Sequence, residues 1–213
     1  MFKLLLFLVL FSCAHKTNEY IKRKKLDVPE EGIAFKKEEP GIYHFDIIVK
    51  EKTSKYLISD YIYHTLNVLC FDSGFNFMSA VKTPVKIINI EGLKFKQLQA
   101  RGFCYPENKR KVININFVNQ KNNIMEVDKV NIPSLVKPGD ILLTFNGKQI
   151  KNLLELRKLI FKLGDDISKN GTISLGVKRG DKELILEHPI MILNDLEAFS
   201  QYYYDLYKEK VMN

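Results

Sequence analysis

Few residue patterns in this sequence of 213 residues could support catalysis. The four histidines form no His-Glu-x-x-His pair, which a helical zinc peptidase site needs. Neither a Gly-x-Ser-x-Gly nucleophile turn nor a phosphate-binding Walker loop is present. Cys70 and Cys104 each lack a second ligand at the close spacing typical of zinc sites. The sequence therefore predicts a protein that is not an enzyme and that holds no metal and no cofactor.

Two patterns within residues 41–100 leave a catalytic alternative open. Asp60 and His64 are four residues apart, which places both on one face of a helix. Asp72-Ser73-Gly74 is similar to the active-site triplet of retropepsin-like aspartic proteases, which need two such aspartates sharing one proton. Because the triplet follows an expected helix, we interpret it as the turn that ends that helix. A protease, or a degenerate protease, that uses Asp72 or His64 is the alternative function.

The chain begins with the pattern of an export signal. Lys3 precedes an apolar run over residues 4–11, which is too short to span about 30 Å of hydrocarbon as a helix. The following Leu10-Phe11-Ser12-Cys13 resembles the lipobox of bacterial lipoproteins. The resemblance implies a signal peptide over residues 1–12 and a lipid on Cys13, and several acyl chains on one residue make an anchor durable.

The residue after the lipobox cysteine indicates a location. In Gram-negative lipoproteins an aspartate there is associated with retention in the inner membrane, and this chain has Ala14. The resemblance therefore implies a lipid-anchored protein of the bacterial cell envelope, in the outer membrane and facing the periplasm.

Cys70 and Cys104 remain once Cys13 is assigned to the lipid. Two thiols in an oxidising compartment favour a disulfide, provided that they come within reach of each other. The alternative is a pair of separate buried thiols that act as small apolar groups.

The balance of charge bears on the partners. Lysine and arginine outnumber aspartate and glutamate by 33 to 25, so the net charge is +8. Such a surplus favours anionic surfaces, but nucleic-acid binders usually concentrate basic residues on one face. Here the basic residues are spread along the whole chain. We therefore expect the membrane and a peptide or protein as partners, and no nucleic acid.

The segment over residues 135–150 carries the most specific pattern. A leucine and Lys137-Pro138-Gly139-Asp140 precede an apolar strand over residues 141–145, and Asn146-Gly147 follows it. Pro-Gly turns the chain into the strand, the aspartate can bond nearby amides, and Asn-Gly tolerates the positive φ of the next turn. The segment resembles a bacterial PDZ domain of the type that high-temperature-requirement proteases carry.

The elements around that segment follow the order of the PDZ family. A helix is expected over about residues 152–163, and a hairpin around Arg179-Gly180-Asp181. The resemblance covers residues 101–190. It implies that a peptide adds as a strand to an open sheet edge beside the helix.

The resemblance also implies which residues would bind that peptide. Gly102 and Phe103 are the best candidates for the carboxylate-binding loop. On the helix, the stripe of Leu153, Leu156, Ile160 and Leu163 is expected to face the core. The groove-lining face is then the neighbouring one, with Leu154, Arg157 and Phe161.

The predicted fold class is α+β. Residues 13–40 are expected to be a polar tether, residues 41–100 a small α/β element, and residues 191–213 a C-terminal helix. Within the α/β element we expect one helix that ends at Gly74, and a helix or irregular segment over residues 90–100. Residues 101–190 would form a PDZ-like, partly open β-barrel with one or two helices.

Three functions remain open at this level. The first is a lipid-anchored, non-catalytic adaptor that binds peptides or protein partners, such as an envelope protease. The second is an accessory or degenerate part of an envelope protease, because Leu69-Cys70 ahead of a PDZ-like segment is similar to the forepart of some bacterial zinc metallopeptidases. The third is a structural lipoprotein whose PDZ-like fold only packs.

Overall fold

The computed structural model describes residues 31–118, 124–163, 171–194 and 196–212. These residues form a mixed α+β fold, which confirms the predicted class. The strands belong to two larger sheets and one two-stranded sheet, and none of these sheets closes into a barrel. The predicted signal peptide and the lipobox Cys13 lie outside the described residues.

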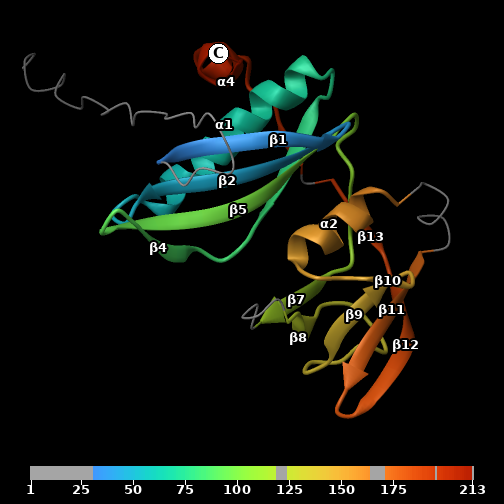
Figure 1. Ribbon diagram of the computed structural model, residues 1–213. Coiled ribbons are helices and arrows are strands. Elements are labelled where there is room, and N and C mark those ends of the chain that lie inside the picture. The colour runs from blue at the N-terminus through green and yellow to red at the C-terminus, as the bar shows by residue number, and fades with distance from the viewer. Residues whose placement is uncertain (1–30, 119–123, 164–170, 195, 213) are drawn as a thin grey trace, which may run out of the picture.

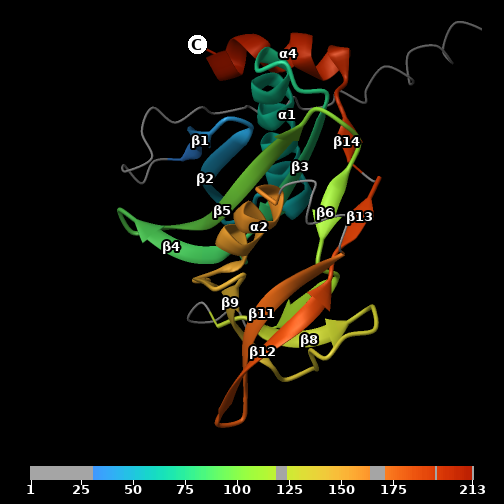
Figure 2. The ribbon, with the colours of Figure 1, turned by 90° about the vertical axis from the view of Figure 1, so that its right-hand side faces the viewer.

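The molecule has two lobes, each with its own hydrophobic core (Figure 1). We call residues 31–105 together with 196–212 the first lobe, and residues 106–194 the second lobe. Figure 2 shows that the chain leaves the first lobe, builds the second, and returns to the first at the C-terminal helix. The second lobe is therefore inserted between parts of the first.

The first lobe consists of an antiparallel sheet and two helices. Its elements are β1 (Gly32–Glu39), β2 (Ile42–Lys50), α1 (Lys55–Asp72), β3 (Phe77–Lys82), β4 (Lys86–Ile90), β5 (Leu93–Tyr105), β14 (Glu197–Ala198) and α4 (Gln201–Met212). The strand order is β1-β2-β5-β3-β14, and β4 pairs with β5 outside this path. The helices α1 and α4 lie on the same side of the sheet (Figure 1).

Helix α1 forms where the sequence predicted a helix. The Ser54 side chain accepts a hydrogen bond from the Tyr56 N–H, which satisfies one of the free amides of the first turn. Its buried side, which includes Ile62 and Leu66, packs on the sheet, and a disulfide joins Cys70 near its end to Cys104 on β5. This is the cysteine pair for which the sequence favoured a bridge.

Two expectations for the first lobe are wrong. The tether was placed over residues 13–40, but residues 32–39 form β1, because Ile33 is fully buried and the whole strand pairs with β2. The helix or irregular segment expected over residues 90–100 is the hairpin of β4 and β5, which turns at Glu91-Gly92 with positive φ at both residues. Leu98 and Ala100 alternate inward there, with the period of two that a strand requires.

The C-terminal segment belongs to the first lobe. Among the described residues of the segment 191–213, Gln201–Met212 form the helix, which therefore starts later than expected. Tyr204 and Val211 are buried in the core of the first lobe, and the Tyr204 hydroxyl donates a hydrogen bond of 2.5 Å to the Asp72 carboxylate. The bond between Tyr204 and Asp72 joins residues 132 positions apart and fixes this helix against α1. The sequence near the helix could therefore not predict where the helix packs.

The second lobe is built mainly of short antiparallel strands. Its elements are β6 (Arg110–Val112), β7 (Ile115–Val118), β8 (Glu126–Val130), β9 (Ile141–Phe145), β10 (Lys148–Gln149), α2 (Leu153–Phe161), β11 (Thr172–Arg179), β12 (Lys182–Pro189) and β13 (Met191–Leu193). The larger sheet has the order β12-β11-β9-β8-β7, with β10 paired to β9. The strands β13 and β6 form a separate pair.

The turn before β9 is fixed as the sequence suggested. Asp140 is buried, and its carboxylate accepts hydrogen bonds from the Lys137 amide and from the guanidinium of Arg179 at 2.7 and 2.8 Å. Burial alone would raise the pKa of Asp140, but Arg179 and the amide outweigh it and hold the pKa below its ordinary value. Asn146 and Gly147 both have positive φ in the turn that follows β9.

Candidate functional site

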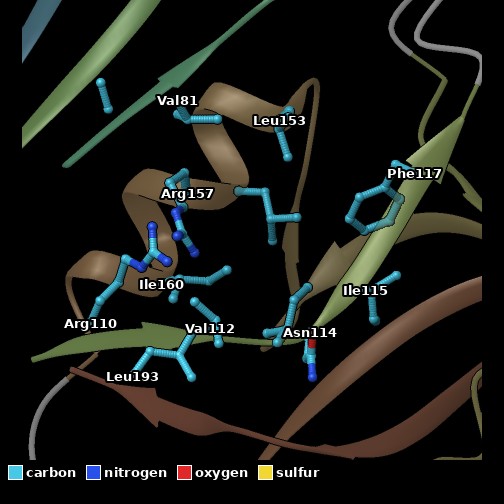
Figure 3. Close-up of a pocket in the computed structure, with 13 residues that line it drawn as sticks. Val81, Arg110, Val112, Asn114, Ile115, Phe117, Leu153, Arg157, Ile160 and Leu193 are labelled. Atoms are coloured by element: carbon cyan, nitrogen blue, oxygen red, sulfur yellow. The ribbon is translucent and has the colours of Figure 1, made fainter. Parts of the chain in front are cut away.

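A hollow in the second lobe lies between α2 and the strands β6 and β7 (Figure 3). Its volume is about 310 Å³. Its lining is mostly apolar and comes from four strands, α2 and the segments next to them. The residues are Ala80, Val81, Arg110, Val112, Ile113, Asn114, Ile115, Phe117, Leu153, Leu156, Arg157, Ile160 and Leu193.

Helix α2 forms one wall of the hollow. Asn152 caps its start by accepting a hydrogen bond from the Glu155 N–H at 2.9 Å. Leu153, Arg157 and Ile160 follow at intervals of four and three residues, which places them on one side of the helix. Figure 3 shows all three on the side of α2 that faces β6 and β7.

Strand β7 forms the opposite wall, and it is the last strand of its sheet. The Asn131 N–H donates to the Asn114 carbonyl, and Ile115 pairs with Val130 one step further along the ladder. Residues along an antiparallel pair alternate between those that exchange hydrogen bonds and those that do not. The main-chain N–H and C=O of Ile115 are therefore directed away from β8, toward the outer edge of the sheet.

The two ends of the hollow differ in charge. Arg110 of β6 and Arg157 of α2 lie at one end, whereas Phe117 lies at the other (Figure 3). The Arg157 guanidinium donates a hydrogen bond of 3.3 Å to the Lys111 carbonyl. Ala80 and Val81, from β3 of the first lobe, also line the hollow. The site is therefore apolar along its length, basic at one end, and shared between the two lobes.

A buried histidine supports the start of β7. His188 is fully buried, with Nε2 2.5 Å from the Ile113 carbonyl and Nδ1 2.7 Å from the Ser134 hydroxyl. Since a carbonyl can only accept, Nε2 carries the proton and Nδ1 accepts from Ser134. Burial lowers the pKa of His188, against a smaller opposing effect of the Ile113 carbonyl, so the neutral form is favoured.

A neighbouring side of α2 contacts the first lobe. The Phe161 ring lies 5.1 Å from the ring of Phe103 and 5.0 Å from that of Tyr105. Lys158 forms ion pairs with Glu38 and Glu39, and Lys162 forms one with Glu39. The helix is therefore fixed to the first lobe on one side while its other side lines the hollow.

Glu38 also connects strands within the first lobe. It accepts a hydrogen bond of 2.8 Å from Arg101 on β5 in addition to its ion pair with Lys158. Burial on its own would raise the pKa of Glu38, but these two cations outweigh it and lower the pKa. Glu38 is therefore charged at neutral pH and can hold both lobes.

These contacts correct the residues expected in the groove. Of the three predicted on the helix, only Arg157 lines the hollow. Phe161 packs on the first lobe, and Leu154, which is buried, does not line the hollow. In the stripe that was expected to face the core, Leu156 and Ile160 are buried in it and also line the hollow, as does the partly buried Leu153.

Gly102 and Phe103 do not form a carboxylate-binding loop. Both lie within β5, paired with β2 on one side and β3 on the other. A Cβ at Gly102 would come within 2.5 Å of the Leu66 side chain, so this glycine allows α1 to pack closely on the sheet. The predicted second domain therefore begins after Tyr105, five residues later than expected.

Asp60 and His64 both line a hollow beside α1, but Asp72 lies apart from them. Asp72 binds the Tyr204 hydroxyl at the end of α1, whereas the His64 ring stacks on that of Tyr207 at a centroid distance of 4.4 Å. Eight helical residues separate Asp72 from His64, which is about 12 Å along the axis. Among the residues that the structure describes, no three His, Cys, Asp or Glu side chains form a group that could hold a metal ion.

A scan against protein-family models gave no match, and a search among curated proteins gave none either. Within the described part of the chain, no helix has both the length and the apolar character needed to cross a bilayer.

Proposed function

We propose that this protein is a lipid-anchored adaptor of the bacterial cell envelope that binds an extended peptide segment between β7 and α2. In this proposal the second lobe is PDZ-like, and the peptide adds to β7 as a further strand. Main-chain hydrogen bonds to the strand edge would supply affinity, and side-chain contacts in the hollow would supply selectivity. The ligand would be a segment of a protein partner, such as an envelope protease.

One observation carries the proposal: the terminal strand β7 faces α2 across a hollow lined by apolar side chains. A strand edge with an outward-directed N–H and C=O is a template for another strand. Leu153, Ile160 and Phe117 provide apolar contacts on either side of such a strand. The turn at Asp140, the Asn146-Gly147 turn, α2 and the β11–β12 hairpin follow in the order of the PDZ family, which supports the same interpretation.

A peptide-array screen with the purified protein tests this proposal. Leu153→Asp and Phe117→Asp place a charge inside the hollow, and each should weaken the strongest array binders at least tenfold. Ile185→Asp is the matched control, because Ile185 is 81% exposed on β12, the other terminal strand of the same sheet. Array binding that responds to Ile185→Asp and ignores both groove variants would contradict the proposal.

The alternative of an accessory or degenerate protease part is tested in the same preparation. An unfolded fluorescent casein is incubated with the protein and with its Asp72→Asn and His64→Ala variants. Cleavage by the parent chain that either variant abolishes would favour the alternative over the adaptor. The adaptor proposal predicts that the substrate stays intact in all three samples.

We also propose that Cys13 is acylated and anchors the protein in the outer membrane. The lipobox resemblance supports this, and a Cys70–Cys104 disulfide is consistent with an oxidising compartment. Metabolic labelling with an alkyne analogue of palmitate, in a Gram-negative host, should mark the parent chain and leave Cys13→Ser unlabelled. Equal labelling of both chains would exclude Cys13 as the acceptor.

A further inference from the structure

A second hollow lies in the first lobe. It shares no lining residue with the hollow beside α2, but β3 contributes to both, with Met78 in one and Ala80 and Val81 in the other. Its volume is about 440 Å³, and it is enclosed by the polar side of α1, by β3 and by the chain from β14 to α4. Its lining is rich in hydrogen-bonding groups. The residues are Ser59, Asp60, Tyr63, His64, Asn67, Met78, Glu197, Ala198 and Ser200.

Asn67 is the residue that points to a ligand. Its side chain is 2% exposed, and its Nδ2 donates a hydrogen bond of 3.2 Å to the Ser200 carbonyl. Because a carbonyl cannot donate, this bond fixes the orientation of the amide. Its Oδ1 is buried and has no hydrogen-bond partner. A buried acceptor of this kind calls for a donor from outside the chain.

Two carboxylates line the same hollow. Asp60 projects from α1, and Glu197 from β14 on the other side. Burial raises the pKa of Glu197, while the charge of Lys82 partly opposes this. Neither carboxylate forms a salt bridge with another of the described residues. The hollow therefore offers one neutral acceptor and two acidic ones.

Lys82 does not donate a hydrogen bond to Asn67 Oδ1. Its ammonium donates a hydrogen bond of 2.7 Å to the Ser59 hydroxyl and lies 5.8 Å from the centre of the Tyr63 ring. Its ammonium thus contacts Ser59 and Tyr63, two residues that line the hollow. Asn67 Oδ1 remains without a donor in this arrangement.

We propose that this hollow, the amine pocket, binds a primary ammonium or a guanidinium group. Such a group carries several N–H donors and a positive charge, which match Asn67 Oδ1 and the carboxylates of Asp60 and Glu197. The ligand is either a small free amine or a lysine or arginine side chain of a partner. The amine pocket is independent of the groove.

Titration of the full chain, followed by the NMR signals of the Asn67 side-chain amide, tests the amine pocket. The probes are n-butylammonium, N-acetyl-arginine methylamide and neutral 1-pentanol. Both cationic probes should shift the Asn67 signals in a saturable way, and pentanol should not. Glu197→Gln and Asp60→Asn should each weaken binding of the cations at least fivefold, whereas Glu183→Gln, on exposed β12, should leave it unchanged.

Two further arms separate the sources of the cation and the two proposed sites. An N-acetylated, C-amidated peptide with one internal lysine tests for a partner side chain, and n-butylammonium tests for a free amine; saturable binding of either supports the pocket. Leu153→Asp should leave this binding unchanged, so loss of groove function does not affect the result. The proposal is overturned if no cation shifts Asn67, or if both acidic-residue variants bind as tightly as the parent chain.

Discussion

The sheets of the two lobes differ in which of their edges pair with later parts of the chain. In the first lobe, β14 covers the outer side of β3, and α4 packs against α1. In the second lobe, β7 has β8 on one side and, among the described residues, no strand on the other. The C-terminal segment thus pairs with one edge of the first sheet, whose other terminal strand is β1, whereas β7 lies beside the hollow next to α2 with β8 as its described partner. The proposed peptide site uses this edge of the second lobe.

Removal of the Cys70–Cys104 disulfide should lower the free energy of unfolding by the largest amount, and mainly in the first lobe. The bond closes a loop with a sequence separation of 34 residues. Constraint of the unfolded chain by a loop of this length is worth about 3–4 kcal/mol. In the Cys70→Ala, Cys104→Ala double variant, native-state hydrogen exchange should show that free energy lost from amides of β2 and β5. Equal losses from β9 and β11 would mean that the lobes unfold as one unit.

The Asp140→Ala substitution should destabilise the second lobe, as loss of the disulfide destabilises the first. It leaves the Lys137 amide and the Arg179 guanidinium without their buried acceptor. The expected loss is about 2 kcal/mol, below the value for a fully buried pair because the Arg179 side chain is 36% exposed. Hydrogen exchange should register this loss at β9 and β11. A loss that is larger at β2 and β5 would contradict the division into two cores.

Acidification should lower the stability of the second lobe by a smaller amount, through protonation of His188. Its pKa is lowered in the folded protein, so the unfolded chain binds more protons as pH falls below about 6.5. Stability therefore falls with pH in that range, by at most about 1.4 kcal/mol per pH unit for one histidine.

The His188→Gln variant sharpens this prediction. Urea unfolding between pH 7 and pH 5, followed by exchange at β9 and β11, should show a weaker pH dependence than the parent chain. His44 also has a pKa lowered mainly by burial, so His44→Gln should flatten the dependence at β2 and β5 instead. An unchanged slope in His188→Gln would show that protonation of this residue is not linked to unfolding.

The sequence allowed most of the second lobe to be predicted, because its signals are local. The alternation of apolar and polar residues over 112–118 predicts one strand. β7 lies there, but Asn114 has positive φ and separates it from β6, which overlaps this segment only at Val112. The Lys137 amide bonds Asp140 within its own turn, and Asn146 and Gly147 both have the positive φ expected of their residue types, although Arg179 and Ser174 of β11 also bond these turns. The stripe on α2 correctly gave Leu156 and Ile160 as core residues.

The groove residues could not be predicted in the same way. Helix α2 has apolar side chains on more than one side, and periodicity does not say which side meets the first lobe. Phe161 was assigned to the groove because the sequence does not reveal that Phe103 and Tyr105 are its partners. The same limit applies to the C-terminal helix, whose partners lie on α1. Contacts between residues far apart in the chain decide both cases, between the lobes for α2 and within the first lobe for the C-terminal helix, and they have no signature in local sequence.

The most direct measurement is amide hydrogen exchange of the whole protein with and without a peptide selected on the array. The account predicts slower exchange at Ile115 and its neighbours in β7 when the peptide is bound, with little change in β12. Slower exchange along β12, or in the β4–β5 hairpin, with β7 unchanged would contradict strand addition beside α2.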